Sequence, residues 1–289
     1  MACDELTIHA RPTLHDARMV LGLTGWMDGG DVSTGTVDWL VRLLGADRLA
    51  DIDTGGFYIT SFPGTMDVSA MFRPHARIAD GLITELTFPA NVFYCDRESN
   101  LILFSGKEPN LRWEAYAECI FSLAETFDVG RIYFIGSVAG VVPHTREPRL
   151  HCSLSDAALK GEFEGYGVRF SNYEGPASIV TYMTRHAAGR GLEMAALVAE
   201  IPAYVQGANP ICIASTTRRL AAILGLQVNL DDLRAVREAF EAKLTELVAE
   251  REQLADLVGK LESDYDNEVF DTQMGDLKDW LERQGIRLD

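Results

Sequence analysis

Short apolar runs alternate with amphipathic stretches along the first 228 residues of this chain. The runs that have the pattern of strands are 18–24, 56–60, 82–86, 91–95, 100–106, 131–136 and 193–201. The stretches with apolar side chains at helical spacing are 32–44, 109–127, 178–190 and 210–224. This alternation predicts a three-layer α/β/α fold, in which helices cover both faces of a mostly parallel central sheet.

The last part of the chain follows a different rule, because apolar residues recur there at every seventh position. We expect one helix over 231–262, roughly 48 Å long at about 1.5 Å per residue. Such a helix either lies along its own domain or packs against another subunit. We therefore divide the chain into an α/β domain, residues 1–228, and an acidic helical extension, residues 229–289. The residues expected at the oligomer or partner surface of this helix are Leu233, Phe240, Leu247, Leu254 and Leu261.

Charge narrows the range of partners. The chain carries 26 Lys and Arg against 43 Asp and Glu, a formal net charge of −17. Residues 229–289 hold 8 basic and 17 acidic residues, so this segment contributes −9 and the rest of the chain −8. A strongly acidic protein is repelled by phosphate backbones and by anionic membranes, so we expect neither nucleic acid nor a membrane as partner.

The sequence also gives an expectation for the compartment. The N-terminus lacks the basic start and apolar run of a signal peptide, and no apolar stretch approaches the roughly 20 residues that span a bilayer. The cysteines are scattered without a C-x-x-C pair, which predicts free thiols in a reducing environment. We therefore expect a cytoplasmic protein. The cysteines in question are Cys3, Cys95, Cys119, Cys152 and Cys212.

Ligands of open α/β sheets bind beyond the carboxyl ends of the strands, so the loops there are the candidate site. The first of these loops contains Gly25, Trp26, Asp28 and Gly29 and leads into a helix. Its glycines and the free N–H groups of that helix suit an anion. Asp28 would repel one, however, and neither a Walker lysine nor a G-x-G-x-x-G spacing is present. A tight turn that caps the helix is the alternative.

Three further loops carry groups capable of acid–base or charge chemistry. Glu108 precedes Pro109 and could act on a ligand or simply cap the following helix. His144 suits proton transfer near neutral pH, and Arg146, two residues on, suits a carboxylate or phosphate. The alternative is that the His144-Thr145-Arg146 segment only ties its loop to neighbouring groups. Glu174 lies in the fourth loop, a turn rich in Gly and Pro.

Several kinds of catalytic machinery are missing from the sequence. There is no G-x-S-x-G nucleophile elbow and no H-E-x-x-H zinc helix, and the histidines show no ligand spacing with cysteines. We therefore expect no metal and no cofactor. Asp28, Glu108, His144 and Arg146 would form an acid–base set only if the fold brings them together. The residues alone leave catalysis open.

Taken together, the loops resemble the PAC2 family, named for proteasome assembly chaperone 2. The resemblance covers roughly residues 15–225. The matching pieces, in chain order, are Gly25-Trp26 with Asp28, Gly106-Lys107-Glu108-Pro109 with Trp113, His144-Thr145-Arg146, Tyr173-Glu174-Gly175-Pro176, and Pro202-Ala203-Tyr204 with Pro210.

This resemblance implies a fold related to nucleoside phosphorylases and hydrolases with a C-terminal helical extension. It also implies a homo-oligomer, with a trimer among the expected assemblies, and a non-catalytic role in protein interaction or assembly. Chaperones of this group dock on proteasome rings through a hydrophobic-Tyr-X tail, whereas this chain ends in Ile286-Arg287-Leu288-Asp289, which argues against direct proteasome docking. The alternative function is an enzyme or small-molecule binder that uses a nucleoside phosphorylase-like or hydrolase-like cleft, or a ligase, as some relatives are labelled.

Overall fold

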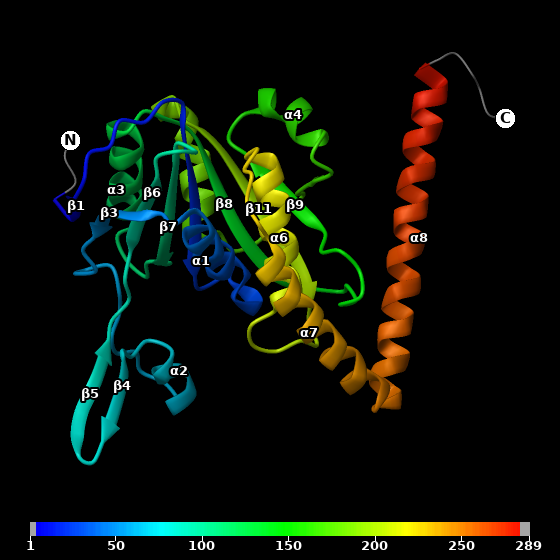
Figure 1. Cartoon of the computed structure of the whole chain (residues 1–289), viewed down its shortest axis with the longest axis horizontal. Coiled ribbons are helices and arrows are strands. Elements are labelled where there is room, and N and C mark those ends of the chain that lie inside the picture. Colours follow the sequence, from blue (N-terminus) through cyan, green and yellow to red (C-terminus); the bar gives the residue numbers. More distant parts are fainter. Residues whose placement is uncertain (1–3, 284–289) are drawn as a thin grey trace.

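The structure is a computed structural model that describes residues 4–283, with side chains described as far as residue 271. A nine-stranded sheet dominates it, in the order β1-β3-β6-β7-β2-β8-β11-β9-β10, and β4 and β5 pair separately (Figure 1). The strands are β1 (Leu6–Ile8), β2 (Ala17–Thr24), β3 (Asp47–Ile52), β4 (His75–Ala79), β5 (Leu82–Thr87), β6 (Val92–Asp96), β7 (Leu101–Lys107), β8 (Val129–Gly140), β9 (Leu150–Leu154), β10 (Arg169–Phe170) and β11 (Glu193–Pro202).

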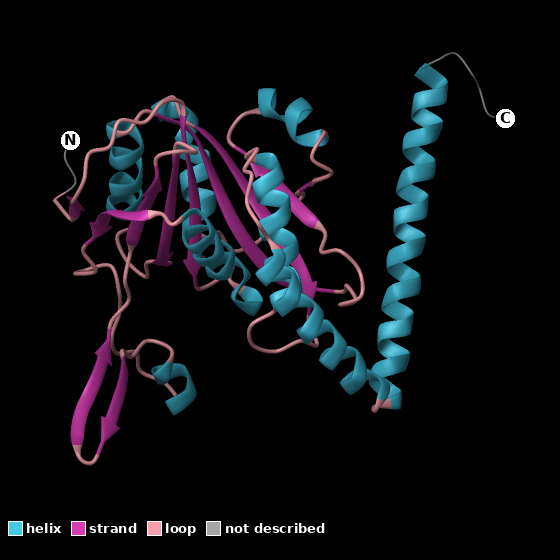
Figure 2. Cartoon of the chain, in the orientation of Figure 1, coloured by secondary structure: helices cyan, strands magenta, loops and turns pink. Residues whose placement is uncertain are grey.

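The helices lie around this sheet and beyond its edge (Figure 2). They are α1 (Val32–Leu44), α2 (Met66–Ala70), α3 (Trp113–Thr126), α4 (Lys160–Glu164), α5 (Ile179–Ala187), α6 (Pro210–Ile223), α7 (Asp231–Ala249) and α8 (Glu252–Arg283). The four central strands β7, β2, β8 and β11 run parallel, and antiparallel strands flank them on both sides. The prediction of an α/β fold with a mostly parallel central sheet is therefore confirmed.

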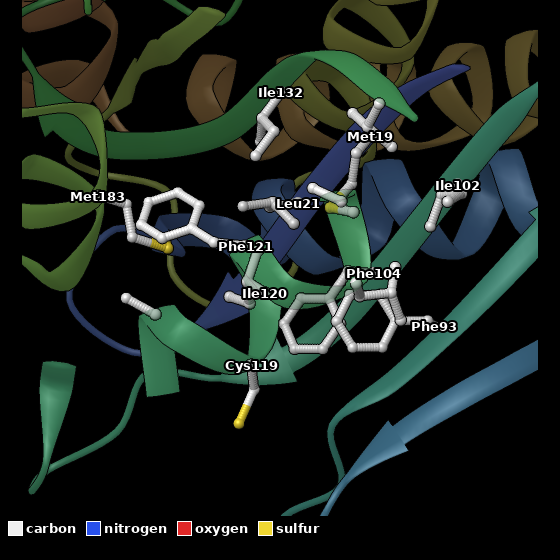
Figure 3. Close-up of a cluster of buried hydrophobic side chains, with 14 of the residues drawn as sticks. Met19, Leu21, Phe93, Ile102, Phe104, Cys119, Ile120, Phe121, Ile132 and Met183 are labelled. Carbon is white, nitrogen blue, oxygen red and sulfur yellow. The ribbon is translucent and has the colours of Figure 1, made fainter. Parts of the chain in front are cut away.

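Alternation along the central strands explains the three layers. In β2, Met19 and Leu21 point to one face of the sheet, where they join a fully buried cluster with side chains from α3 and α5 (Figure 3). Val20, between them, points to the opposite face and packs with Val37 of α1. Strands that are apolar at every position thus bury both faces at once, which is why they appear in the sequence as continuous apolar runs.

Residues 59–90 form an arm that extends away from the body (Figure 1). The arm contains α2 and the β4–β5 hairpin, and Figure 1 places it at the end of the molecule toward which the central strands run. One expectation is wrong here, because residues 56–60 are a turn and loop instead of a strand. Residues 82–86 do form a strand, which pairs with β4 outside the central sheet.

The C-terminal part forms two helices instead of one. Helix α7 ends at Ala249, and α8 begins at Glu252 and runs in a new direction (Figure 1). The predicted continuous helix over 231–262 is therefore wrong. Val248 near the end of α7 and Val258 near the start of α8 are buried. Neither belongs to the predicted row of every seventh residue. The boundary between two domains at residue 228 stays a prediction.

Three of the cysteines, Cys95, Cys152 and Cys212, are buried free thiols. Burial raises their pKa values, to about 11 for Cys95 and about 12 for the other two. Cys119 is disulfide-bonded, so the prediction of free thiols throughout fails for this residue, and Cys3 lies outside the described residues. In the described part of the chain, no helix has the length and apolar character that a membrane crossing requires.

Candidate functional site

The loop after β2 is held by Asp28. Its Oδ1 accepts hydrogen bonds from the backbone N–H of Ser33 at 2.8 Å and of Thr34 at 3.2 Å, and its Oδ2 accepts one from the Thr34 hydroxyl at 2.8 Å. Burial raises the pKa of Asp28 to about 6, although these hydrogen bonds oppose the shift. The free N–H groups that an anion would need at the start of α1 are thus already bonded to this carboxylate. The capping alternative describes this loop.

Glu108 links two loops that lie far apart in the sequence. Its Oε2 accepts a hydrogen bond from the backbone N–H of Trp26 and its Oε1 accepts one from Ile179, both at 3.1 Å. Glu108 therefore bonds the first turn of α5, whereas the capping alternative placed it on the helix that follows Pro109. Gly25 fits the arrangement because its φ of 134° suits glycine, and an added Cβ would lie 3.0 Å from the Glu108 Cβ.

His144 is buried, with 3% of its surface exposed. Its Nδ1 lies 2.7 Å from the Tyr204 hydroxyl oxygen, which also accepts a hydrogen bond from the His144 backbone N–H at 2.7 Å. Its Nε2 lies 3.4 Å from the hydroxyl of Thr245 on α7. Burial lowers the pKa of His144, so the imidazole is neutral at pH 7. Both ring nitrogens thus have neighbours within the protein.

The residues after His144 bind the acidic helix α8. Arg146 donates two parallel hydrogen bonds to Asp266, at 2.8 and 2.7 Å, and lies 3.6 Å from Glu262. The Thr145 hydroxyl donates to Glu262, and Arg149 and Arg169 both pair with Glu268. The hydroxyl of Tyr265 donates to the backbone carbonyl of Glu147 at 2.9 Å. Helix α8 is thus bound to the α/β body of its own protomer, mainly by ion pairs.

The predicted site residues therefore form separate groups. Gly25, Trp26 and Glu108 lie together, Asp28 and Gly29 lie at the start of α1, and residues 144–146 face the C-terminal helices. Among residues 4–271, no hydrogen bond or ion pair joins Asp28 or Glu108 to His144 or Arg146. Glu174 is exposed in its loop. Their shared role in one cleft stays a prediction.

The heptad row of the tail is covered unevenly within the protomer. Leu233 and Leu261 are buried, Phe240 and Leu254 are half-buried, and Leu247 is 40% exposed. The buried members contribute to packing within this chain. Their proposed role between subunits stays a prediction.

The structure has a cavity that the sequence did not indicate. It is open to solvent and has a volume of about 300 Å³ between the base of the arm and the carboxyl ends of β2 and β7. Thr24, Ser105 and Lys107 line it from the strands, and Arg73 and His75 line it from the arm. In the described part of the chain, no group of three His, Cys, Asp or Glu side chains could hold a metal ion.

Asn91 fixes one side of this cavity. Its buried Oδ1 accepts hydrogen bonds from the hydroxyls of Tyr58 and Tyr116, at 2.8 and 3.0 Å, and from the Lys107 backbone N–H at 3.1 Å. Burial raises the pKa of Tyr58 to about 12, so its phenol stays neutral. The Gly106-Lys107-Glu108-Pro109 segment is the sequence signal for this region, and its cavity-lining residue is Lys107 instead of the predicted Glu108.

Solved structures with a similar fold come from bacteria and archaea. A proteasome-assembly chaperone homologue from Mycobacterium tuberculosis is 28% identical, with a TM-score of 0.71, and the match covers 83% of this chain and 99% of that one. A second protein from that organism, described as of unknown function, is 21% identical, with a TM-score of 0.82 over 94% of this chain and 92% of that one.

A PAC2 family protein from Streptomyces avermitilis is 24% identical, with a TM-score of 0.70 over 84% of this chain and all of that one. An archaeal proteasome activator from Pyrococcus furiosus is 18% identical, with a TM-score of 0.60, and the match covers 84% of this chain and 97% of that one. Among curated proteins, none matches the chain. The PAC2 family model matches residues 22–248. The chain therefore belongs to the PAC2 family.

Proposed function

We propose that this protein is a non-catalytic, assembly-chaperone-like member of the PAC2 family that works as a homo-oligomer. The observation that carries the proposal is the apolar face of the arm, made of Ile78 on β4 and of Ile83 and Leu86 on β5. These side chains are 66%, 70% and 55% exposed. Two bacterial and archaeal relatives are described as a proteasome-assembly chaperone homologue and a proteasome activator, which supports protein binding as the function.

The β4–β5 hairpin has two unlike faces. Ile78 pairs with Ile83 across the hairpin, whereas Arg77 pairs with Glu85 on the opposite face, where their charged groups lie 3.6 Å apart. A two-stranded hairpin is only marginally stable when both faces meet water, and large exposed apolar patches mark contact surfaces. The apolar face is uncovered within this protomer, so it suits contact with another chain.

A second copy of the chain is the partner that charge favours. Residues 59–90 carry two arginines against three acidic residues, whereas the whole chain has a net charge of −17. Two copies that meet through the arm would bring nearly neutral surfaces together and keep their acidic parts apart. Glu108, His144 and Arg146 are engaged with other groups of the chain, which favours interaction over catalysis as the function.

Light scattering after size-exclusion chromatography tests the proposal. We expect an oligomer for the full chain, and a smaller species when Ile78→Lys and Ile83→Lys are combined. The matched control combines Arg77→Gln and Glu85→Gln on the other face of the hairpin, and it should leave the mass unchanged. Ile78 and Ile83 are exposed within the protomer, so both variants should keep the far-UV circular dichroism spectrum of the folded chain. A monomeric wild type, or an unchanged mass in the Ile78/Ile83 variant, would contradict the proposal.

A further inference from the structure

The cavity beneath the arm has walls from two different parts of the chain. Thr24, Ser105 and Lys107 lie at the carboxyl ends of β2 and β7, whereas the other walls come from the arm. Arg73 lies between α2 and β4, His75 begins β4, and Phe88 follows β5. Its volume of about 300 Å³ falls at the lower end of the range of small-molecule sites, which is roughly 300–1,000 Å³. The space therefore suits a small ligand better than a polypeptide.

The lining of the cavity is basic in an otherwise acidic protein. Lys107, Arg73 and His75 line it, and no Asp or Glu is among its described lining residues. Glu108, next to Lys107, is turned away and accepts hydrogen bonds from the backbone of two other loops. The Lys107 ammonium lies 5.9 Å from the centre of the Tyr58 ring. Among the described residues, no ion pair neutralises Lys107.

One carboxylate borders this basic lining. Asp38 of α1 accepts a hydrogen bond from the hydroxyl of Ser105, over a distance of 3.4 Å. Its negative charge opposes an anion in the cavity, by an amount that falls with distance and with salt. Asp38 thus offers a variant whose effect on anion affinity has the opposite sign to that of Lys107.

Aromatic and proline side chains complete the wall. Tyr58, Phe72 and Phe88 lie in the lining together with Pro74 and Pro89. The Asn91 side chain accepts hydrogen bonds from the Tyr58 hydroxyl and from the Lys107 backbone N–H. It therefore fixes the position of the Tyr58 ring relative to the Lys107 backbone. We propose that this cavity binds a small organic anion, whose acidic group meets Lys107 and Arg73 and whose planar apolar group packs against the aromatic rings. The site stands independently of the proposed homo-oligomer.

Isothermal titration calorimetry at constant ionic strength tests this site in the full chain. The probes are phenyl phosphate, benzoate, inorganic phosphate and the neutral benzyl alcohol. We expect saturable binding of phenyl phosphate or benzoate, and weaker binding of inorganic phosphate and of benzyl alcohol. The better of the two aromatic anions identifies the acidic group as phosphate or carboxylate.

Variants locate the binding. Lys107→Gln should lower the affinity for the aromatic anion by roughly tenfold, because a charge-assisted hydrogen bond is lost. Asp38→Asn should raise this affinity. Lys243→Gln on α7 makes the same change of net charge far from the cavity and should leave the affinity unchanged. Unfolding midpoints show that each variant is folded. Absence of saturable binding for both aromatic anions at millimolar concentration, or equal affinity in the wild type and Lys107→Gln, would overturn the proposal.

Discussion

Arg146 holds Asp266 of α8 through two parallel hydrogen bonds, of 2.8 and 2.7 Å, across 120 positions of the sequence. Replacing either residue, as in Arg146→Gln or Asp266→Asn, should loosen α8 and leave the sheet intact. Hydrogen exchange of the α8 amides should rise in both single variants, and by more in Arg146→Gln because Arg146 also lies 3.6 Å from Glu262. The double variant should not exceed Arg146→Gln, because the pair with Asp266 is already broken there. Arg234→Gln, which breaks a pair with Asp231 inside α7 alone, is the matched control. Exchange in α8 that matches the wild type would contradict this role.

The same pair gives α8 a dependence on pH. Arg146 lowers the pKa of Asp266 below its usual value of 3.8. A carboxyl whose pKa is lower in the folded state contributes stability above the unfolded pKa and loses it as pH falls through the folded value. We expect α8 to stay attached at neutral pH and to exchange faster below about pH 4. Hydrogen exchange corrected for intrinsic rates should show this rise in the wild type, with a smaller rise in Arg146→Gln.

The contribution of Asp28 to stability should depend on pH in the opposite sense. Its pKa is about 6 in the folded protein against 3.8 for the ordinary carboxyl, so the folded state binds the proton more tightly. The contribution of this group to stability therefore increases as pH falls from above 6 to about 4, by roughly 2 to 3 kcal/mol. Asp28→Asn keeps an acceptor for the Ser33 N–H and removes the titration. In urea unfolding, the free energy of unfolding of the variant should increase relative to that of the wild type from pH 4 to pH 7. Parallel dependences of the two free energies on pH would refute the assignment.

Glu108 should matter for stability through two backbone donors. Glu108→Ala leaves the N–H groups of Trp26 and Ile179 without their acceptor, which should cost about 2 kcal/mol of unfolding free energy. Glu108→Gln keeps one side-chain oxygen and should cost about half as much. Urea denaturation measures both values. Glu174→Ala, in an exposed loop, is the control and should change stability little; a Glu108→Ala variant as stable as this control would contradict the account.

Gly22 determines how closely α1 approaches β2. An added Cβ there would lie 2.7 Å from the Ser33 carbonyl oxygen and 2.7 Å from the Val37 Cγ2. Gly22→Ala should therefore push α1 outward and destabilise the protein by about 1 to 3 kcal/mol. Gly130→Ala is the matched control, because nothing lies within 4 Å of an added Cβ there. Thermal unfolding that gives equal midpoints for the two variants would show that α1 has room to move.

The sequence predicts the parts of the fold whose pattern matches their burial. Strand β2 and helix α1 could be recognised because β2 is buried on both faces and α1 presents one apolar stripe. Strand β4, His75–Ala79, was missed because its sequence contains no apolar run, whereas the equally exposed β5 has one. The break between α7 and α8 could not be predicted from local sequence, because it contains neither Gly nor Pro. We attribute it to the burial of Val248 and Val258 on either side.

The candidate site was harder to predict than the fold. Glu108 was a candidate for ligand chemistry or for capping the next helix, but its partner Ile179 lies 71 positions away, and local spacing cannot predict such a contact. Arg146 has the chemistry of a ligand-binding residue, and the carboxylates that it meets come from its own tail. The cavity could not be predicted because its basic residues come from separate segments that meet only in the folded chain.

The two ends of the segment that carries the arm meet at one point of the sheet. The N–H of Ile52, the last residue of β3, donates a 3.0 Å hydrogen bond to the carbonyl of Asn91, just before β6, and the two strands are antiparallel neighbours. For the sheet, the arm is therefore an insertion at a hairpin corner. Its length and sequence can diverge between relatives while the strand register stays the same. The contact surface and the cavity wall that it supplies can thus evolve faster than the scaffold that bears them.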